Sequence, residues 1–110
     1  MSQVMDLSKT GLNMFFKPYQ IAALNVLWDS SEPLSSREVM EEVNKNMTER
    51  ISRASIINFL NASVEHGMLD FIETTGKGGY RRLYSAKISS FQIKSFLTRM
   101  VEEQLQTLPQ

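Results

Sequence analysis

The chain has 110 residues, an apolar fraction of 42%, twelve basic and twelve acidic side chains, and no cysteine. This length predicts one domain, and the apolar fraction is ordinary for a globular protein, so extensive disorder is not expected. The lack of cysteine excludes a disulfide framework and a thiolate metal site. No apolar run approaches the roughly 18 residues that span a bilayer, and no signal-peptide pattern opens the sequence, so we expect a cytoplasmic protein.

The zero net charge conceals an uneven distribution along the chain. The first 47 residues carry four basic and six acidic side chains, whereas the next 40 carry six basic and four acidic ones. Four of those six bases follow one another closely in a stretch without acidic residues: Lys77, Arg81, Arg82 and Lys87. A basic patch on a neutral protein can still contact a phosphate backbone, although binding without sequence preference should then be weak.

The first 29 residues predict a polar arm and a helix. We expect residues 1–13 to form a flexible N-terminal arm. Residues 14–16, Met-Phe-Phe, are too apolar to be left in water, so they either fold back on the core or cover a partner subunit. Pro18 suits the first turn of a helix, and apolar side chains at three- and four-residue spacing extend that helix to about residue 29: Ile21, Leu24, Leu27 and Trp28.

The following segment predicts a second helix after a short connection. Leu34 is expected to form a very short strand or to plug the core. Ser35, with Glu38 three residues later, makes a capping box that opens the helix. The buried stripe of this helix is expected to consist of Val39, Met40, Val43 and Met47.

The third predicted helix covers about residues 52–66, with Ser52 as its N-cap and Gly67 as its stop. Its apolar residues are Ile56, Ile57, Phe59, Leu60 and Val64. Another side of the helical wheel groups small side chains: Ser55, Asn58 and Ala62, with Ser52 and His66 near the edges. Short side chains would let this side lie deep in the major groove of DNA, where Asn58 is the best candidate to read an adenine. A solvated helix face is the alternative interpretation.

A glycine-rich hairpin follows, with strands expected over residues 68–74 and 80–86. A DNA-contacting wing needs a compact tip and cations, and this segment supplies both: Gly76, Lys77, Gly78, Gly79, Arg81 and Arg82. Since alternate residues of a strand face opposite sides, Arg81 and Arg82 cannot both face DNA, and one of them can pair with Glu73 instead. A core role is expected for Tyr80, Leu83 and Tyr84. A solvated β-ribbon is the alternative for the whole hairpin.

No competing chemistry stands out. The sequence around Gly76 does not match a Walker A loop. Phe71 occupies the position of the first glycine of that motif, and Gly78 occupies the position of its Ser or Thr. The single His66 has no cysteine or helical His or Glu partner at ligand spacing, so we expect neither a metal nor another cofactor. No nucleophile–base–acid set is placed convincingly, and an enzyme is not expected.

The last predicted helix covers about residues 90–107, is capped by Ser89 or Ser90, and ends before Pro109. Its apolar stripe is wide for the terminal helix of so small a domain: Ile93, Phe96, Leu97, Met100, Val101, Leu105 and Leu108. The stripe either packs on the chain's own core or forms a self-complementary dimer seam, which we favour. The element order predicts an α+β, mostly α, fold: a winged helix-turn-helix over residues 14–88 and a C-terminal dimerisation helix over 89–110.

At these residues the sequence resembles a family. The stretch SRASIINFLNASVEHGMLDFIETTGKGGYRRLYSA, with KPYQIAALNVLW and PLSSREVMEEV before it, is similar to the penicillinase-repressor (BlaI/MecI/CopY) family of winged-helix transcription regulators, and most like its archaeal branch. The similarity covers roughly residues 16–88 and is most specific in the third helix. It implies that Ser55 and Asn58 face bases, that the last helix builds a homodimer, and that phosphates lie near Arg53, Lys77, Arg81 and Arg82.

The sequence also departs from that family. Ala62 stands where members usually carry Arg, and Ser63 where they carry Leu, so one expected DNA contact is missing. The C-terminal part is shorter than in the antibiotic-resistance repressors, and the Cys-rich tail of the copper-responsive members is absent, so neither drug resistance nor copper sensing is implied.

Together these observations predict a homodimeric, sequence-specific regulator of double-stranded DNA, acting as a repressor. The complete set of expected DNA contacts is Arg37, Ser52, Arg53, Ser55, Asn58, Ala62, Lys77, Arg81 and Arg82. The seam of the expected dimer is Ile93, Phe96, Leu97, Met100, Val101 and Leu105. The alternative is a winged-helix module that binds proteins and not DNA, with which the zero net charge is compatible.

Overall fold

The computed structural model of the protein describes residues 5–76 and 78–109. In chain order they form a 3₁₀ helix η1, four α-helices and three strands: η1 (Gly11–Met14), α1 (Pro18–Asp29), β1 (Leu34–Ser35), α2 (Ser36–Asn44), α3 (Arg53–Glu65), β2 (Leu69–Gly76), β3 (Gly79–Ala86) and α4 (Ile93–Leu105). This is the expected order, with η1 added and with α4 beginning three residues later than predicted.

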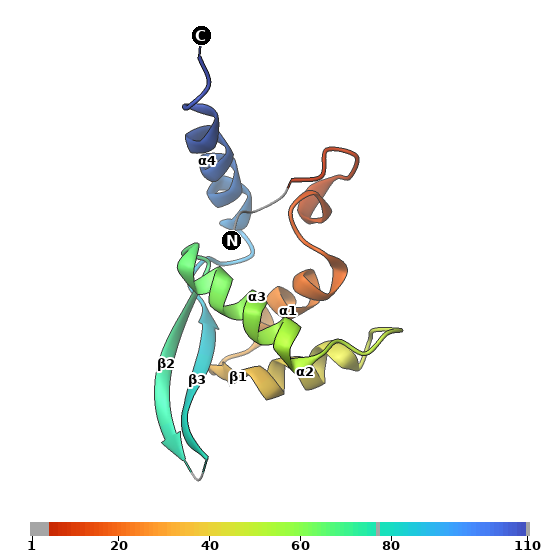
Figure 1. Cartoon of the computed structure of the whole chain (residues 1–110), viewed down its shortest axis with the longest axis vertical. Coiled ribbons are helices and arrows are strands. Elements are labelled where there is room, and N and C mark those ends of the chain that lie inside the picture. Colours follow the sequence, from red (N-terminus) through yellow and green to blue (C-terminus); the bar gives the residue numbers. More distant parts are fainter. Residues whose placement is uncertain (1–4, 77, 110) are drawn as a thin grey trace.

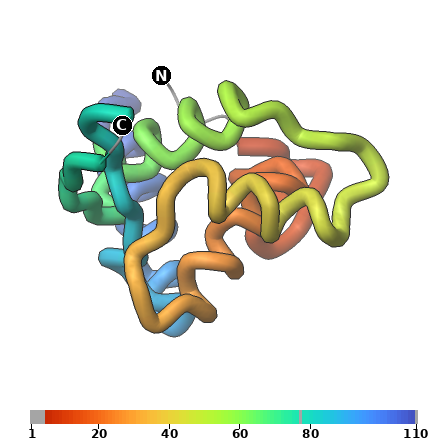
Figure 2. The backbone as a smooth tube through the Cα atoms, turned by 90° about the horizontal axis from the view of Figure 1, so that it is seen from below, coloured from red at the N-terminus to blue at the C-terminus, as the bar shows by residue number. Residues whose placement is uncertain are grey.

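Helices α1, α2 and α3 pack together as the body of the molecule, and the β2–β3 hairpin extends from one side of it (Figure 1). Helix α4 projects from the body in another direction and carries the C-terminus. These two projections make the chain elongated, with principal extents of 56, 30 and 25 Å. Seen from below, the hairpin and the connection between α2 and α3 lie on opposite sides of the body (Figure 2).

One apolar core holds the three helices, the sheet and the base of α4 together. Its fully buried members come from every helix of the body and from β2: Leu24, Val39, Val43, Ile56, Leu60 and Leu69. Phe16 is also buried, and its ring meets that of Phe59 edge-on with the centroids 6.0 Å apart. The Met-Phe-Phe segment therefore folds back on the chain's own core, one of the two alternatives open from the sequence.

Local signals fix both ends of α3 and the start of α2 as predicted. The predicted cap of the last helix is wrong, because the N-cap of α4 is Gln92 and neither Ser89 nor Ser90. The Ser35 hydroxyl accepts from the backbone N–H of Glu38, and the Glu38 carboxylate accepts from the N–H of Ser35, which completes the capping box. Ser52 caps α3 through the backbone N–H of Ser55. Beyond α3, Gly67 adopts φ +85°, the left-handed conformation that ends a helix without steric cost.

The connection between α2 and α3 is closed by a side chain that the sequence analysis did not single out. Asn44 accepts a hydrogen bond from the backbone N–H of Ile51 at 2.8 Å and donates one to the Ile51 carbonyl at 3.1 Å. Helix α2 ends at Asn44, so Met47 lies beyond it and packs half-buried against the core from the loop. These two hydrogen bonds between Asn44 and Ile51 fix the loop from which α3 begins beside α2.

The sheet is antiparallel with the order β1-β3-β2. Strands β2 and β3 stay in register from Leu69↔Ala86 to Gly76↔Gly79. The ladder thus runs closer to the tip than the predicted strands did, and two residues connect the strands. One of them, Lys77, lies outside the described residues. Gly79 adopts φ +93°, a conformation that the tight turn can use because glycine has no side chain.

Three residues expected in the core are not there: Tyr80, Ile57 and Leu83, of which Leu83 is only half-buried on β3. The Tyr80 side chain is 79% exposed, because it stands near the hairpin tip beyond the reach of the helices. Ile57 is only half-buried and faces the hairpin, since the buried side of α3 is formed by Ile56, Phe59, Leu60 and Ser63. Tyr84 is buried as predicted.

Candidate nucleic-acid interface

The outward side of α3 carries few charges and several short side chains. Ala54, Asn58 and Glu65 are exposed there, and Asn61 is half-buried beside them. Their spacing of three and four residues places them on one stripe opposite the buried side of the helix. Asn58 occupies the middle of the stripe, so its amide is free to reach a ligand that lies along α3.

The other predicted readers lie around this stripe. Ser52 and Arg53 are exposed at the start of α3, and the Ser52 hydroxyl donates to Ser55 Oγ at 3.0 Å. Ser55 and Ala62 are half-buried on the flank that faces the N-terminal segment. Their positions are therefore more lateral than the helical wheel suggested, because the core direction is set by Ile56 and Phe59.

Four arginines from three elements surround one groove. Arg37 comes from the first turn of α2, Arg53 from the first turn of α3, and Arg81 and Arg82 from β3. Ile57 lies in the same groove, and Glu73 and Tyr80 complete it on the hairpin side. All four arginines are exposed. The sequence predicted each of them separately, and the fold brings them together.

Arg82 differs from the other three because the protein itself holds its guanidinium. Its Nη1 donates to Oδ1 of Asn61 at 3.1 Å, and its Cζ lies 3.9 Å from the centroid of the Phe71 ring. Arg82 stands opposite Glu73 in the strand register, yet its hydrogen bond goes to α3 and not to Glu73. Arg81 has the opposite orientation along the strand and stays available.

Asn61 is a key residue that the sequence analysis missed. Its Oδ1 also accepts from the Tyr84 hydroxyl at 2.6 Å, so one amide oxygen joins α3 to two residues of β3. Burial raises the pKa of Tyr84, and its hydroxyl remains a donor at neutral pH. The signal was present: Arg82 and Tyr84 are two residues apart and share a strand face, and Asn61 follows Asn58 by one helical turn.

Solved structures of similar shape share this arrangement of helices and hairpin. A possible transcriptional regulator from Methanosarcina mazei Go1 superposes with a TM-score of 0.62 at 11% identity, over 83% of this chain and 72% of that chain. A PadR family transcription regulator from Clostridium difficile R20291 gives 0.54 at 12% identity, over 82% and 96%. Bacillus subtilis PadR, solved in complex with operator DNA, gives 0.52 at 15% identity, over 76% and 46%. The fold is a winged helix.

No family model matches the chain, and no curated protein matches it. In the vocabulary of the winged-helix fold, the β2–β3 hairpin is the wing, and α2 and α3 are the helix-turn-helix. The arginine groove thus lies between the wing and the helix-turn-helix, next to the outward stripe of α3.

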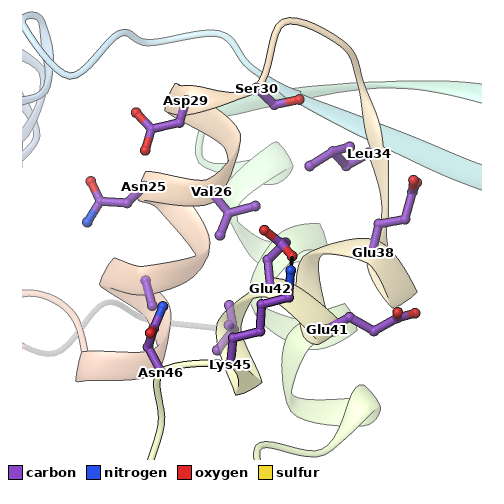
Figure 3. A pocket seen from close by; sticks show the side chains of 12 residues that line it. Asn25, Val26, Asp29, Ser30, Leu34, Glu38, Glu41, Glu42, Lys45 and Asn46 are labelled. Carbon is purple, nitrogen blue, oxygen red and sulfur yellow. Dashed lines mark ion pairs between the residues drawn. The ribbon is translucent and has the colours of Figure 1, made fainter.

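A second surface, between α1 and α2, has the opposite charge. Its lining residues include Asp29 on α1 and Glu38, Glu41 and Glu42 on α2, which are labelled in Figure 3. The single cation among its lining residues is Lys45, which forms an ion pair with Glu42. Four carboxylates against one ammonium make this surface net negative, so it repels a polyanion that the arginine groove attracts.

The C-terminal helix divides into a base and a projecting part. Ile93 and Leu97, two residues of the expected seam, are buried at its base against the chain's own core, and Phe96 and Met100 pack beside them. Val101 is half-buried, and Leu105 is 54% exposed. The apolar stripe therefore starts on the core and continues beyond it into solvent.

The described residues contain no cluster of three or more histidine and carboxylate side chains that could hold a metal ion. None of the helices in residues 5–76 and 78–109 is long and apolar enough to cross a membrane.

Proposed function

We propose that the protein is a sequence-specific regulator of double-stranded DNA that acts as a homodimeric repressor. Helix α3 enters the major groove, and the wing, residues 75–82 with Lys77 included, contacts the backbone. The observation that carries this proposal is the arginine groove, because three elements of the fold bring four cations to one concavity beside a helix stripe that carries a single charge, Glu65. Bacillus subtilis PadR, of the same fold, was solved on operator DNA.

The side chains in and around the groove take different roles. Arg37, Arg53 and Arg81 are exposed and contact phosphates, which positions the protein without reading sequence. Asn58 reads a base edge, since an amide can donate to and accept from adenine in the major groove. Ser52 and Ser55 lie at the start of α3 and add short polar contacts. Arg82 orients the wing through Asn61 and Phe71.

Electrostatics determine which face meets DNA. The negative surface between α1 and α2 disfavours approach from that side, and the arginine groove favours approach along α3. With about 4–6 phosphate contacts per subunit, the affinity should fall by about 0.9 log units per contact for each tenfold rise in salt. A neutral protein of this kind depends on sequence readout more than on bulk attraction.

We further propose that the projecting part of α4 forms the dimer seam. Phe96, Met100 and Val101 lead from the core to Leu105, whose exposed apolar side chain gains by burial against a second copy. Ile93 and Leu97 are buried against the chain's own core, so they fix the base of α4 and thereby the position of this seam. A two-fold axis along the seam would space two α3 helices for half-sites about one helical turn, or a multiple of it, apart.

Membership of the penicillinase-repressor family is part of the proposal. It is supported by the resemblance of residues 16–88 and by the winged-helix fold. The departure at Ala62 fits its half-buried position on the flank of α3, where the neighbouring surface belongs to the N-terminal segment.

A titration of duplex DNA selected from genomic fragments tests the proposed function. Arg81→Ala should weaken binding to all sequences by a similar factor, whereas Asn58→Ala should reduce discrimination at one base pair. Binding to random duplex at low salt distinguishes a DNA-binding protein from the alternative, a module that binds proteins and not DNA. If the wild-type protein binds neither selected nor random duplex at low salt, the DNA proposal is wrong, and the alternative of a protein-binding module is favoured.

Light scattering after size exclusion tests the dimer. Leu105→Glu should convert a dimer to a monomer, because it places a charge in the seam at a position exposed in the single chain. Ser95→Glu adds the same charge to the opposite, exposed side of α4 and should leave the dimer intact. A wild-type protein with the mass of one chain would refute the seam.

A further inference from the structure

A second groove runs along the flank of α3 that the wing does not reach. Its α3 side is formed by uncharged side chains and by the histidine that caps the end of the helix: Ser55, Asn58, Phe59, Ala62, Ser63 and His66. Its other side is the N-terminal segment, which contributes Asp6, Lys9, Asn13, Lys17 and Gln20. Asn58 therefore lies at the edge of this groove while also occupying the outward stripe of α3.

The N-terminal segment is fixed in this position by the core. The backbone N–H of Asp6 donates to the Met14 carbonyl at 2.7 Å, which closes the segment into a loop over η1. Below it, the Tyr19 ring meets Phe59 of α3 edge-on, at 6.4 Å between centroids, as the buried Phe16 ring also does. The lysines on this loop thus have a defined place relative to α3.

The wing and this segment occupy opposite sides of α3. Arg53, Ile57 and Asn61 face the wing, as the shared groove and the Asn61–Arg82 hydrogen bond show. Ser55 and Ala62 are seven residues apart, so they share the other side of the helix. In Figure 1 the wing extends to one side of α3 and the N-terminal segment lies on the other.

The charge of this side is positive where it meets solvent. Lys9 and Lys17 are exposed, and the Lys17 side chain makes no capping hydrogen bond to α1. One carboxylate, Asp6, opposes them. Hydrogen bonds from the Ser8 hydroxyl and backbone N–H keep the pKa of Asp6 below its usual range, so it is ionised at neutral pH. Two ammonium groups against one carboxylate leave a net charge of +1.

We propose that Lys9 and Lys17 bind the phosphate backbone of the DNA strand opposite to the one the wing contacts. A helix in the major groove has a backbone on each side, and here each side of α3 has its own cations: Arg81 on the wing, and the two lysines on the N-terminal segment. This inference rests on the proposed function. It makes the N-terminal segment a second clamp that centres Asn58 over the bases.

The test compares salt dependence in the full chain. Lys9→Ala/Lys17→Ala should reduce the slope of log affinity against log salt by about 1.8. If variant and wild type have equal affinity at about 1 M salt, the variant should therefore bind about 60-fold more weakly than the wild type at about 0.1 M. The matched control is Lys45→Ala/Lys94→Ala, which removes two charges outside both grooves and should change the slope little. Asp6→Asn should strengthen binding, since it removes the opposing charge.

Strand-specific neutral linkages supply the second readout. Methylphosphonates on either strand should weaken the wild-type protein, whereas the Lys9/Lys17 double variant should respond only to those on the wing strand. An unchanged slope in this variant, with a normal loss in Arg81→Ala, would overturn the second clamp and leave the proposed function intact. Failure of the wild-type protein to bind any duplex would overturn both.

Discussion

Replacing Asn61 tests how the wing is fixed to α3. In Asn61→Ala the Tyr84 hydroxyl and the Arg82 guanidinium both lose their acceptor. Tyr84 is only 3% exposed, so its unpaired hydroxyl should cost about 1–3 kcal/mol of folding free energy. Arg82 is exposed and can recover hydrogen bonds to water, so its part of the cost is small.

Asn58→Ala is the matched control, because it removes the same amide one helical turn earlier. Asn58 is exposed, so its loss should change stability by no more than about 0.5 kcal/mol. Chemical denaturation of both variants measures the difference directly. In thermal unfolding, each 1 kcal/mol corresponds to roughly 4–8 °C for a domain near this size.

A double-mutant cycle identifies the cause. In a Tyr84→Phe background no hydroxyl remains to be stranded, so the cost of Asn61→Ala should fall well below its value in the wild type. Equal losses for Asn61→Ala and Asn58→Ala, or an Asn61→Ala cost that is unchanged in the Phe background, would show that the Asn61–Tyr84 hydrogen bond does not stabilise the fold.

Two further predictions concern the wing and α2. Tyr80→Ala should alter stability by no more than about 0.5 kcal/mol, whereas Tyr84→Ala should cost about 3–5 kcal/mol, as measured by urea unfolding. Glu38→Gln should destabilise the protein at neutral pH. The backbone N–H and side chain of Ser35 lower the pKa of Glu38, so its stabilisation is fully present above about pH 4.3 and is lost as the pH falls through the lowered value. The stability curves of wild type and variant should therefore converge in acid.

The elements were predictable because their signals are local. The capping box of Ser35 and Glu38, the N-cap at Ser52 and the stop at Gly67 each act within a few residues, and each end of a helix lies where its signal stands. Strand alternation likewise predicted that Arg81 and Arg82 lie on opposite faces of their strand. It could not tell which of them faces α3.

The positions of side chains across elements were less predictable. Ile57 looks like a core residue on a helical wheel, but the core direction of α3 depends on where α1 and the sheet pack, and Ile57 falls on the wing side. The prediction of a core role for Tyr80 is wrong for a related reason, since an aromatic residue in a strand is buried only where a helix covers it. The groove beside Ala62 depends on the N-terminal segment, whose polar sequence carries no periodic signal.

Arg82→Lys separates charge from geometry in the wing. Lysine keeps the positive charge, but its ammonium lacks the planar fork that donates to Asn61 while lying over Phe71. The salt dependence of DNA binding should therefore stay the same, while the affinity falls and the stability drops by about 0.5–1 kcal/mol, the size of an exposed cation–π contact. Arg81→Lys, on the other strand face, should keep both the affinity for DNA and the stability. A smaller salt slope in Arg82→Gln, which removes the charge, would show that this guanidinium contacts phosphate directly, and the wing would then be held to α3 by Asn61 and Tyr84 alone.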